Sequence, residues 1–288
     1  MDGIFLIDKP VGLTSRAVCN QVAKAYHNKK VGHVGTLDPF ASGLLIVAMG
    51  KATKAVTFFD ESIKEYVATI KLGTLTDTLD NTGKVIESKE VRKFDKSEID
   101  NVLNSFLGKS EQIPPMTSAI HVNGKRLYEY AHQGIEVDRP TREIEIYDIR
   151  LIDYDEKNET ITFYSKVSKG TYIRSLGADI ATKLGTVGYL EKLERSGASP
   201  FTIKETNSLE DVLNKNAKIY QSSEVLMRLM KSYSFNDDKI LDIKNGKYTY
   251  LDIDVKEDRI LIVDSSNNAI AVYQKDESNR LKFVRGLF

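Results

Sequence analysis

Residues 32–45 have the sequence GHVGTLDPFASGLL and lie between a helix-like segment and an apolar run. Gly32 and Gly35 allow the backbone to take up positive φ or to approach a ligand closely. Pro39 has a fixed φ, and it restricts the preceding residue, Asp38, to an extended conformation. An Asp-Pro pair taken alone is most often an ordinary turn. Whether Asp38 is a functional carboxylate therefore depends on residues elsewhere in the chain.

The chain on either side of this stretch predicts short strands and helices. The apolar run 4–7 predicts a buried strand, and the next helix is expected to start with Ser15 as its N-cap. A second buried strand is expected over 44–49, followed by a short helix over 53–59. Residues 65–72 alternate in polarity, which predicts a strand with one face made of Tyr66, Ala68, Ile70 and Leu72.

The second half of the chain continues the mixture of elements. The runs 143–154 and 160–167 predict a hairpin, and residues 171–184 predict a helix that ends at Gly185. From residue 235 onward short strands dominate, so we expect a domain of residues 1–232 and a small all-β module of residues 236–288. Without a regular βαβ alternation, the expected class is α+β with a mixed, largely antiparallel sheet flanked by helices.

Composition excludes several classes of protein. Hydrophobic residues make up 41% of the 288 residues and charged residues 28%, which is typical of a globular protein. The 41 basic and 41 acidic residues cancel, so any nucleic-acid interface has to be a local basic surface. The single cysteine, Cys19, excludes an internal disulfide and fits a reducing compartment. Neither a signal peptide nor a membrane span is indicated, and we expect a cytoplasmic protein.

The candidates for catalysis reduce to one carboxylate. The chain has no nucleophile elbow, no phosphate-binding loop, and no paired spacing among its four histidines, so no metal site is indicated. Asp38 can act as a nucleophile or a base if a cation holds its charged form. Arg174 is the best candidate for that cation. A positive charge in the first turn of a helix is destabilised by the helix dipole, by roughly 0.3–1 kcal/mol, so an arginine there needs a compensating anion. Its position suggests an anionic partner, either Asp38 or a phosphate.

Two aromatic residues lie beside polar turns. Tyr66 and Tyr172 are by default core residues, but in a nucleic-acid site each could stack on a base, worth roughly 1–3 kcal/mol. Basic residues between positions 9 and 30, together with Lys125 and Arg126, offer weak support for phosphate contacts.

Taken together, these stretches resemble the TruB family of tRNA pseudouridine synthases over most of residues 3–200. Seven motifs occur in the order that the family has. They are LIDKPVGLTS at 6–15, GHVGTLDP at 32–39, KEY at 64–66, TDT at 76–78 with Asp80 and Gly83, QIPP at 112–115 with Ser118 and Ala119, GKRLYE at 124–129, and SKGTYIRSL at 168–176.

The resemblance implies a pseudouridine-synthase core and isomerisation of the uridine at tRNA position 55, in the T loop. Asp38 would be the essential carboxylate. Tyr66 would stack on the flipped base, Tyr172 would lie beside it, and Arg174 would pair with Asp38. His33 would help to displace the uridine, and Lys9 would support the site. The T stem-loop of tRNA is then the partner, with no metal or organic cofactor and no obligate protein partner implied, and a monomer is expected.

Some residues depart from the family pattern. Thr117 stands where an aromatic residue is frequent, His121 where a lysine is common, and His132 where an arginine is common. The C-terminal module resembles the family's PUA-type RNA-binding domain in position, size and strand content alone. Asp38 itself could act by attacking the sugar, by attacking the base, or by removing a sugar proton.

Two alternatives belong to other functional classes. An RNA-binding or tRNA-folding protein would need no catalysis, and replacing Asp38 by asparagine would then have no effect in vivo. A metal-assisted nuclease using Asp38, Asp77 and Asp80 would cleave strands and would be sensitive to chelators.

Overall fold

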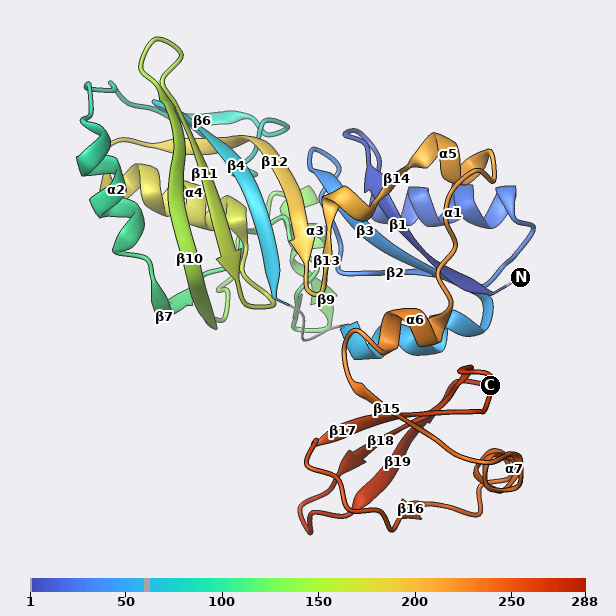
Figure 1. The fold of residues 1–288 in the computed structure, drawn as a ribbon. Helices are drawn as coiled ribbons and strands as arrows, with labels where there is room; N and C mark the ends of the chain where they lie inside the picture. The colour runs from blue at the N-terminus through green and yellow to red at the C-terminus, as the bar shows by residue number, and fades with distance from the viewer. Residues whose placement is uncertain (1, 60–62) are drawn as a thin grey trace. The chain divides into compact units, whose positions relative to one another are not determined.

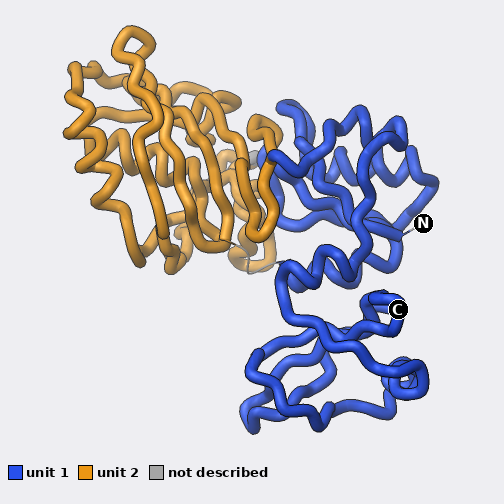
Figure 2. Tube along the Cα trace, viewed as in Figure 1, with its two compact units in different colours: residues 1–38, 44–60, 204–288 blue, residues 39–43, 61–203 orange. Residues whose placement is uncertain are grey.

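A computed structural model describes residues 2–59 and 63–288 of the chain. The chain forms two compact units, shown in different colours in Figure 2. Unit 1 contains residues 1–38, 44–60 and 204–288, and unit 2 contains residues 39–43 and 61–203. The loop that carries Asp38 therefore ends unit 1 where the chain first enters unit 2.

Unit 1 begins with a small mixed sheet covered by helices. Strand β1 (Gly3–Lys9) is followed by α1 (Ser15–Ala25), β2 (Val31–Val34), β3 (Ser42–Met49) and the 3-10 helix η1 (Gly50–Phe59). Strand β1 lies between β3 and the short parallel strand β14 (Asn207–Ser208), and β2 pairs antiparallel with β3. The helices α5 (Leu209–Leu213) and α6 (Ser222–Leu226) complete this part of the unit. Both strands expected from the apolar runs are confirmed.

The start of α1 differs from the sequence prediction by one residue. Thr14 is the N-cap, because its hydroxyl accepts a hydrogen bond from the backbone N–H of Ala17 at 3.0 Å. Ser15 is instead buried, and its hydroxyl bonds to the backbone of Leu37. Both residues are good caps by type, so the prediction of Ser15 was wrong because tertiary burial selected between two neighbours.

Unit 2 is built on a twisted, largely antiparallel sheet (Figure 1). Its main strands run in the order β12 (Gly188–Ala198), β4 (Lys64–Leu72), β11 (Thr160–Val167), β10 (Arg142–Asp155) and β7 (Gly108–Gln112). Strand β13 (Phe201–Thr202) pairs antiparallel with the end of β12, and the first two residues of β3 pair parallel with β12. The expected β10–β11 hairpin and the buried face of β4 are confirmed.

Helices and short ribbons surround this sheet. Helix α4 (Ile173–Lys183) packs against β12 and β4, and α2 (Lys96–Asn104) packs against β10. Strands β5 (Thr74–Thr76) and β6 (Val85–Ser88) form one ribbon, and β8 (His121–Val122) with β9 (Lys125–Arg126) forms another, followed by α3 (Leu127–His132). The mixed architecture confirms the α+β class. The side chain of His132 lies outside the described residues, so its departure from the family pattern stays untested.

The C-terminal part of unit 1 has a sheet and a core of its own. Five strands run in the order β15 (Lys231–Ser234), β17 (Arg259–Val263), β18 (Ala269–Lys275), β19 (Leu281–Gly286) and β16 (Tyr250–Leu251). Its core is aliphatic apart from the buried ring of Tyr273. The small β module is thus confirmed, although the sequence pattern missed helix α7 (Asp237–Lys244), whose N-cap is Asn236. The assignment of residues 1–232 and 236–288 as separate domains stays a prediction.

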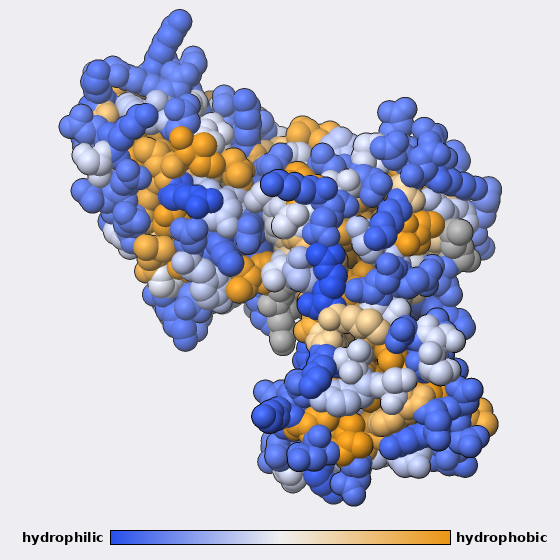
Figure 3. All heavy atoms as spheres, viewed as in Figure 1, coloured by the Kyte–Doolittle hydropathy of each residue, from blue (hydrophilic) through white to orange (hydrophobic). Residues whose placement is uncertain are grey.

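The surface of the protein is mostly polar. Figure 3 shows hydrophilic side chains over much of one face, with hydrophobic side chains gathered in separate patches. The most exposed hydrophobic residues include Val11, Val85 and Ile86. Among the described residues, no helix is long and apolar enough to cross a membrane.

The glycines of residues 32–45 follow the expectation in part. Gly35 has a φ of 64°, as predicted, but Gly32 lies within β2 and is not among the positive-φ residues. Gly43 is the most constrained of the three, with a φ of 102°. A Cβ atom there would lie 2.5 Å from the carbonyl oxygen of Arg195, because β3 and β12 run side by side at this point.

We therefore predict that Gly43→Ala lowers the free energy of unfolding by about 2–5 kcal/mol, since it adds backbone strain to a steric clash with a main chain. Gly32→Ala is the matched control, because a Cβ there meets no atom within 4 Å. Its effect should stay within about 0.5 kcal/mol. Urea unfolding measures both, and equal effects would contradict this account.

Candidate active site

Asp38 lies in the loop between β2 and β3 of unit 1, and its side chain is half-buried. The preceding residue, Leu37, is buried, and its backbone is held by the hydroxyl of Ser15 from the start of α1. Because Pro39 restricts the other side, the carboxylate projects from a backbone that is constrained in both directions. The sequence predicted the constraint from Pro39 and missed the one from Ser15.

Lys9 and His33 also belong to unit 1. The ammonium group of Lys9 is fully buried at the end of β1, where it donates to the carbonyl oxygens of Pro10 at 2.9 Å and Leu13 at 2.7 Å. These bonds fix the turn between β1 and α1, which is how a buried lysine is stabilised. His33 lies in β2 opposite Val47 of β3. The roles of Lys9 and His33 toward a substrate stay predictions.

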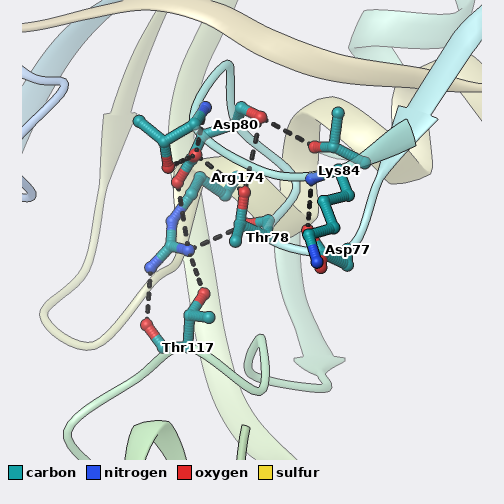
Figure 4. Close-up of polar contacts among 8 residues, drawn as sticks. Asp77, Thr78, Asp80, Lys84, Thr117 and Arg174 are labelled. Atoms are coloured by element: carbon teal, nitrogen blue, oxygen red, sulfur yellow. Dashed lines mark hydrogen bonds and ion pairs between the residues drawn. The ribbon is translucent and has the colours of Figure 1, made fainter. Parts of the chain in front are cut away.

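Arg174 lies at the start of α4 in unit 2, and 4% of its side chain is exposed. Its Nη1 lies 3.4 Å from Oδ2 of Asp80 and donates to the carbonyl oxygen of Thr78 at 2.8 Å. The two guanidinium ends also donate to Thr117, to its hydroxyl at 2.5 Å and its carbonyl oxygen at 3.0 Å (Figure 4). Arg174 thus has the anionic partner that its position implied, and that partner is Asp80. Its pairing with Asp38 stays a prediction.

The loop around Asp80 is shaped to present its carboxylate. Oδ1 accepts bonds from the hydroxyl of Thr78 at 2.8 Å and from the backbone N–H of Thr82 at 3.0 Å. The backbones of Asp77 and Lys84 close the base of the loop, where Lys84 N–H also donates to Oδ1 of Asp77 (Figure 4). Oδ2 of Asp80 is left to face the guanidinium. This carboxylate is the partner of a buried cation, which argues against its use in a metal-assisted nuclease.

Tyr172 precedes Arg174 and occupies the N-cap position of α4, not the first turn as predicted. The side chain of Tyr172 makes no capping hydrogen bond to the helix. Instead Gln112, at the end of β7, accepts from the N–H of Tyr172 at 2.8 Å and donates to its carbonyl oxygen at 3.0 Å. Thr171 does not cap α4 either, because its hydroxyl donates to the carbonyl oxygen of Ser168 at 3.0 Å.

Tyr66 lies on the buried face of β4 and is 7% exposed. Its neighbour across the sheet is Arg195 of β12, whose side chain is among the largest fully buried ones. Burial lowers the pKa of the Arg195 guanidinium, and the hydrogen bond that it makes to Tyr66 opposes that shift. The three expected site residues of unit 2 therefore each have a buried polar partner in that unit: Asp80 for Arg174, Gln112 for Tyr172, and Arg195 for Tyr66.

Sequence reasoning missed these partners to different degrees. Gln112 stood within a quoted motif without a role, and Asp80 was considered only as a residue of a metal-assisted nuclease, so their presence in a motif was the available signal. Thr117 was noted as a departure, and the structure shows that its hydroxyl accepts from Arg174. Arg195 had no signal beyond being a basic residue in an apolar strand pattern. His121 is exposed in β8, away from these contacts.

We predict that Asp80→Asn lowers the free energy of unfolding by about 3 kcal/mol, because it removes a negative charge that faces a buried guanidinium. The matched control is Glu143→Gln, which removes the exposed pair between Lys109 and Glu143 at 3.9 Å. That change should cost less than about 0.5 kcal/mol. Thermal and urea unfolding measure both values, and a small effect at Asp80 would show that the pair is not stabilising.

Comparison with known proteins identifies the family. Residues 23–173 match the model of the TruB family pseudouridylate synthase N-terminal domain. A tRNA pseudouridine synthase B of Oceanobacillus iheyensis is 38% identical over 99% of this chain and 97% of its own length. One from Hydrogenovibrio crunogenus is 39% identical over 100% of this chain and 94% of its own length.

The fold agrees with that assignment. The structure of a Cbf5-Nop10-Gar1 complex contains a chain that superposes with a TM-score of 0.75, at 22% identity, over 99% of this chain and 85% of that one. A second, from an archaeal box H/ACA sRNP Nop10-Cbf5 complex, gives 0.72 at 20% identity, over 99% and 86% of the two chains. The expected core type and the resemblance stated from the motifs are both confirmed. The chain belongs to the TruB family of pseudouridylate synthases.

Proposed function

We propose that the protein converts the uridine at position 55 in the T loop of tRNA to pseudouridine, with Asp38 as the essential carboxylate. The observation that carries the choice of substrate is the similarity, over nearly the whole chain, to relatives named tRNA pseudouridine synthase B. The geometry supports the choice of carboxylate. Asp38 is held at Leu37 on one side and at Pro39 on the other, so its side chain is presented from a fixed backbone.

The reaction is an isomerisation that balances without a co-reactant. The bond between N1 of uracil and C1′ of ribose breaks, the uracil turns, and a bond forms between C5 and C1′. The hydrogen on C5 leaves as a proton, and N1 gains a proton. A uridine inside a folded loop has to be flipped out of its stack first, which costs a few kcal/mol. Stacking on an aromatic ring such as that of Tyr66 offsets part of that cost.

The proposed role of Arg174 follows from electrostatics. An aspartate in a pocket of aromatic faces tends to take up a proton, because burial disfavours its charged form. A guanidinium beside it opposes that tendency. Arg174 is buried and is held in place by Asp80, Thr78 and Thr117, so it offers a fixed positive charge rather than a mobile one.

The C-terminal sheet is proposed to contact RNA outside the reacting loop. Strand β19 exposes Lys282 and Arg285, which could neutralise phosphates. We further propose that the protein acts as a monomer in the cytoplasm, where its tRNA substrate is found.

We predict that Asp38→Asn still binds a T stem-loop RNA but releases no tritium from 5-tritiated uridine. The amide keeps the shape of the carboxylate and loses its charge and basicity. Asp100→Asn, which changes an exposed carboxylate of α2 in the same way, should release tritium at the wild-type rate. Substantial release by Asp38→Asn would remove Asp38 from the reaction.

We also predict that Arg174→Ala slows turnover by about a hundredfold, as expected for the loss of a fixed electrostatic group, while much of the tRNA affinity is retained. Arg92→Ala is the control, because Arg92 pairs with Glu98 on the surface of the same unit. Single-turnover tritium release and filter binding separate the two effects. A near-normal rate in Arg174→Ala would contradict the proposed role.

A further inference from the structure

We propose that Ser15 and Gln112 are positioning residues, each of which fixes a functional side chain by binding both polar groups of one backbone residue. Ser15 would fix Asp38 through Leu37, and Gln112 would fix Tyr172 directly. This inference rests on the proposed function, because it assigns a purpose to one buried side chain in each unit.

Ser15 is 1% exposed and reaches Leu37 from the first turn of α1. Its hydroxyl donates to the carbonyl oxygen of Leu37 at 3.1 Å and accepts from the N–H of Leu37 at 2.9 Å. One hydroxyl has one donor and can accept as well, so a single side chain satisfies both backbone groups. Leu37 is 3% exposed, so water cannot easily replace either bond.

The two bonds between Ser15 and Leu37 also restrict the next residue, Asp38. Leu37 cannot rotate about its backbone bonds without breaking a bond to Ser15, and Pro39 restricts Asp38 from the other side. The position of the Asp38 Cα and Cβ atoms is therefore set by α1, a regular element, rather than by the loop. A reactive group placed on a loop gains most from such support, because a displacement of about 1 Å can slow a reaction about a hundredfold.

Gln112 does the same for Tyr172 in unit 2. It is 5% exposed, and its amide pairs with the N–H and the carbonyl oxygen of Tyr172 at 2.8 and 3.0 Å. This two-way pairing reproduces the bonds that two facing residues of an antiparallel sheet exchange. It attaches the N-cap residue of α4 to the end of β7, and Arg174 follows two positions later. Ser175 makes a separate bond nearby, from its hydroxyl to the carbonyl oxygen of Ile113 at 3.0 Å, which involves neither backbone group of Tyr172.

The test for Ser15 compares it with its neighbour. Ser15→Ala should lower the single-turnover rate of tritium release at least tenfold, with the Kd for the T stem-loop RNA changed less than threefold. Ser15→Cys, which keeps the volume and loses the strong hydrogen bonds, should be as slow and guards against a folding defect in the alanine variant. Thr14→Ala removes the helix cap, so it should lower Tm and leave the rate within twofold of wild type.

The test for Gln112 has the same form. Gln112→Leu removes both bonds to Tyr172 with little change in volume and should slow the reaction at least tenfold at unchanged Kd. Ser175→Ala breaks the neighbouring bond to Ile113, so it should lower Tm and leave the rate within twofold. The contrast between rate and Tm separates positioning from general stability.

The outcomes are distinguishable. A wild-type rate in Ser15→Ala and in Gln112→Leu would overturn the inference and leave the proposed function standing. The inference would also be overturned if Thr14→Ala lost as much rate as Ser15→Ala, or if Ser175→Ala lost as much rate as Gln112→Leu. The loss of rate would then follow the loss of stability. A parallel rise in the Kd would overturn the inference as well, because it would place these residues in RNA binding. A wild-type protein that releases no tritium would overturn the proposed function and this inference with it.

Discussion

A buried guanidinium is the constraint on which the organisation of unit 2 depends. Arg174 has almost no exposed surface, so its donors and its charge have to be satisfied by the protein itself. Thr78 and Thr117 accept its hydrogen bonds, and Asp80 supplies the opposite charge. The loop from Asp77 to Lys84 is closed by its own hydrogen bonds, and this closure holds the Asp80 carboxylate in place. A cation that would be unfavourable near a helix N-terminus is stabilised in this way.

A second principle recurs in both units. Loops and helix ends that carry expected site residues are supported by buried polar side chains that bind the backbone. Ser15 binds Leu37, Gln112 binds Tyr172, and Lys9 binds the carbonyl oxygens of the turn that precedes α1. Each contact satisfies backbone groups that are shielded from water, so stability and placement come from the same bonds.

The corrections to the sequence predictions have a common origin. Thr14 and Ser15 are equivalent as caps by residue type, and only the burial of Ser15 against Leu37 separates them. Tyr172 lies at the N-cap of α4 because Gln112 accepts its N–H, a contact across 60 residues of chain. Helix α7 was missed because its two buried isoleucines are surrounded by charged residues, which weakens the apolar pattern. Local sequence patterns indicate which residues can cap or begin a helix, and contacts with residues distant in the chain decide which of them does so.

The sequence by itself determined the α+β class and the alternating face of β4, because periodicity is written in adjacent residues. It also carried the motifs of the family, and the resemblance that they establish made Asp38 the candidate carboxylate. Only the tertiary structure decided that Asp80 is a partner of Arg174, that Gln112 and Ser15 bind distant backbones, and that Arg195 faces Tyr66. These contacts join residues far apart in the chain. No local pattern specifies them, since they depend on which buried polar groups are brought together when the sheets and helices pack.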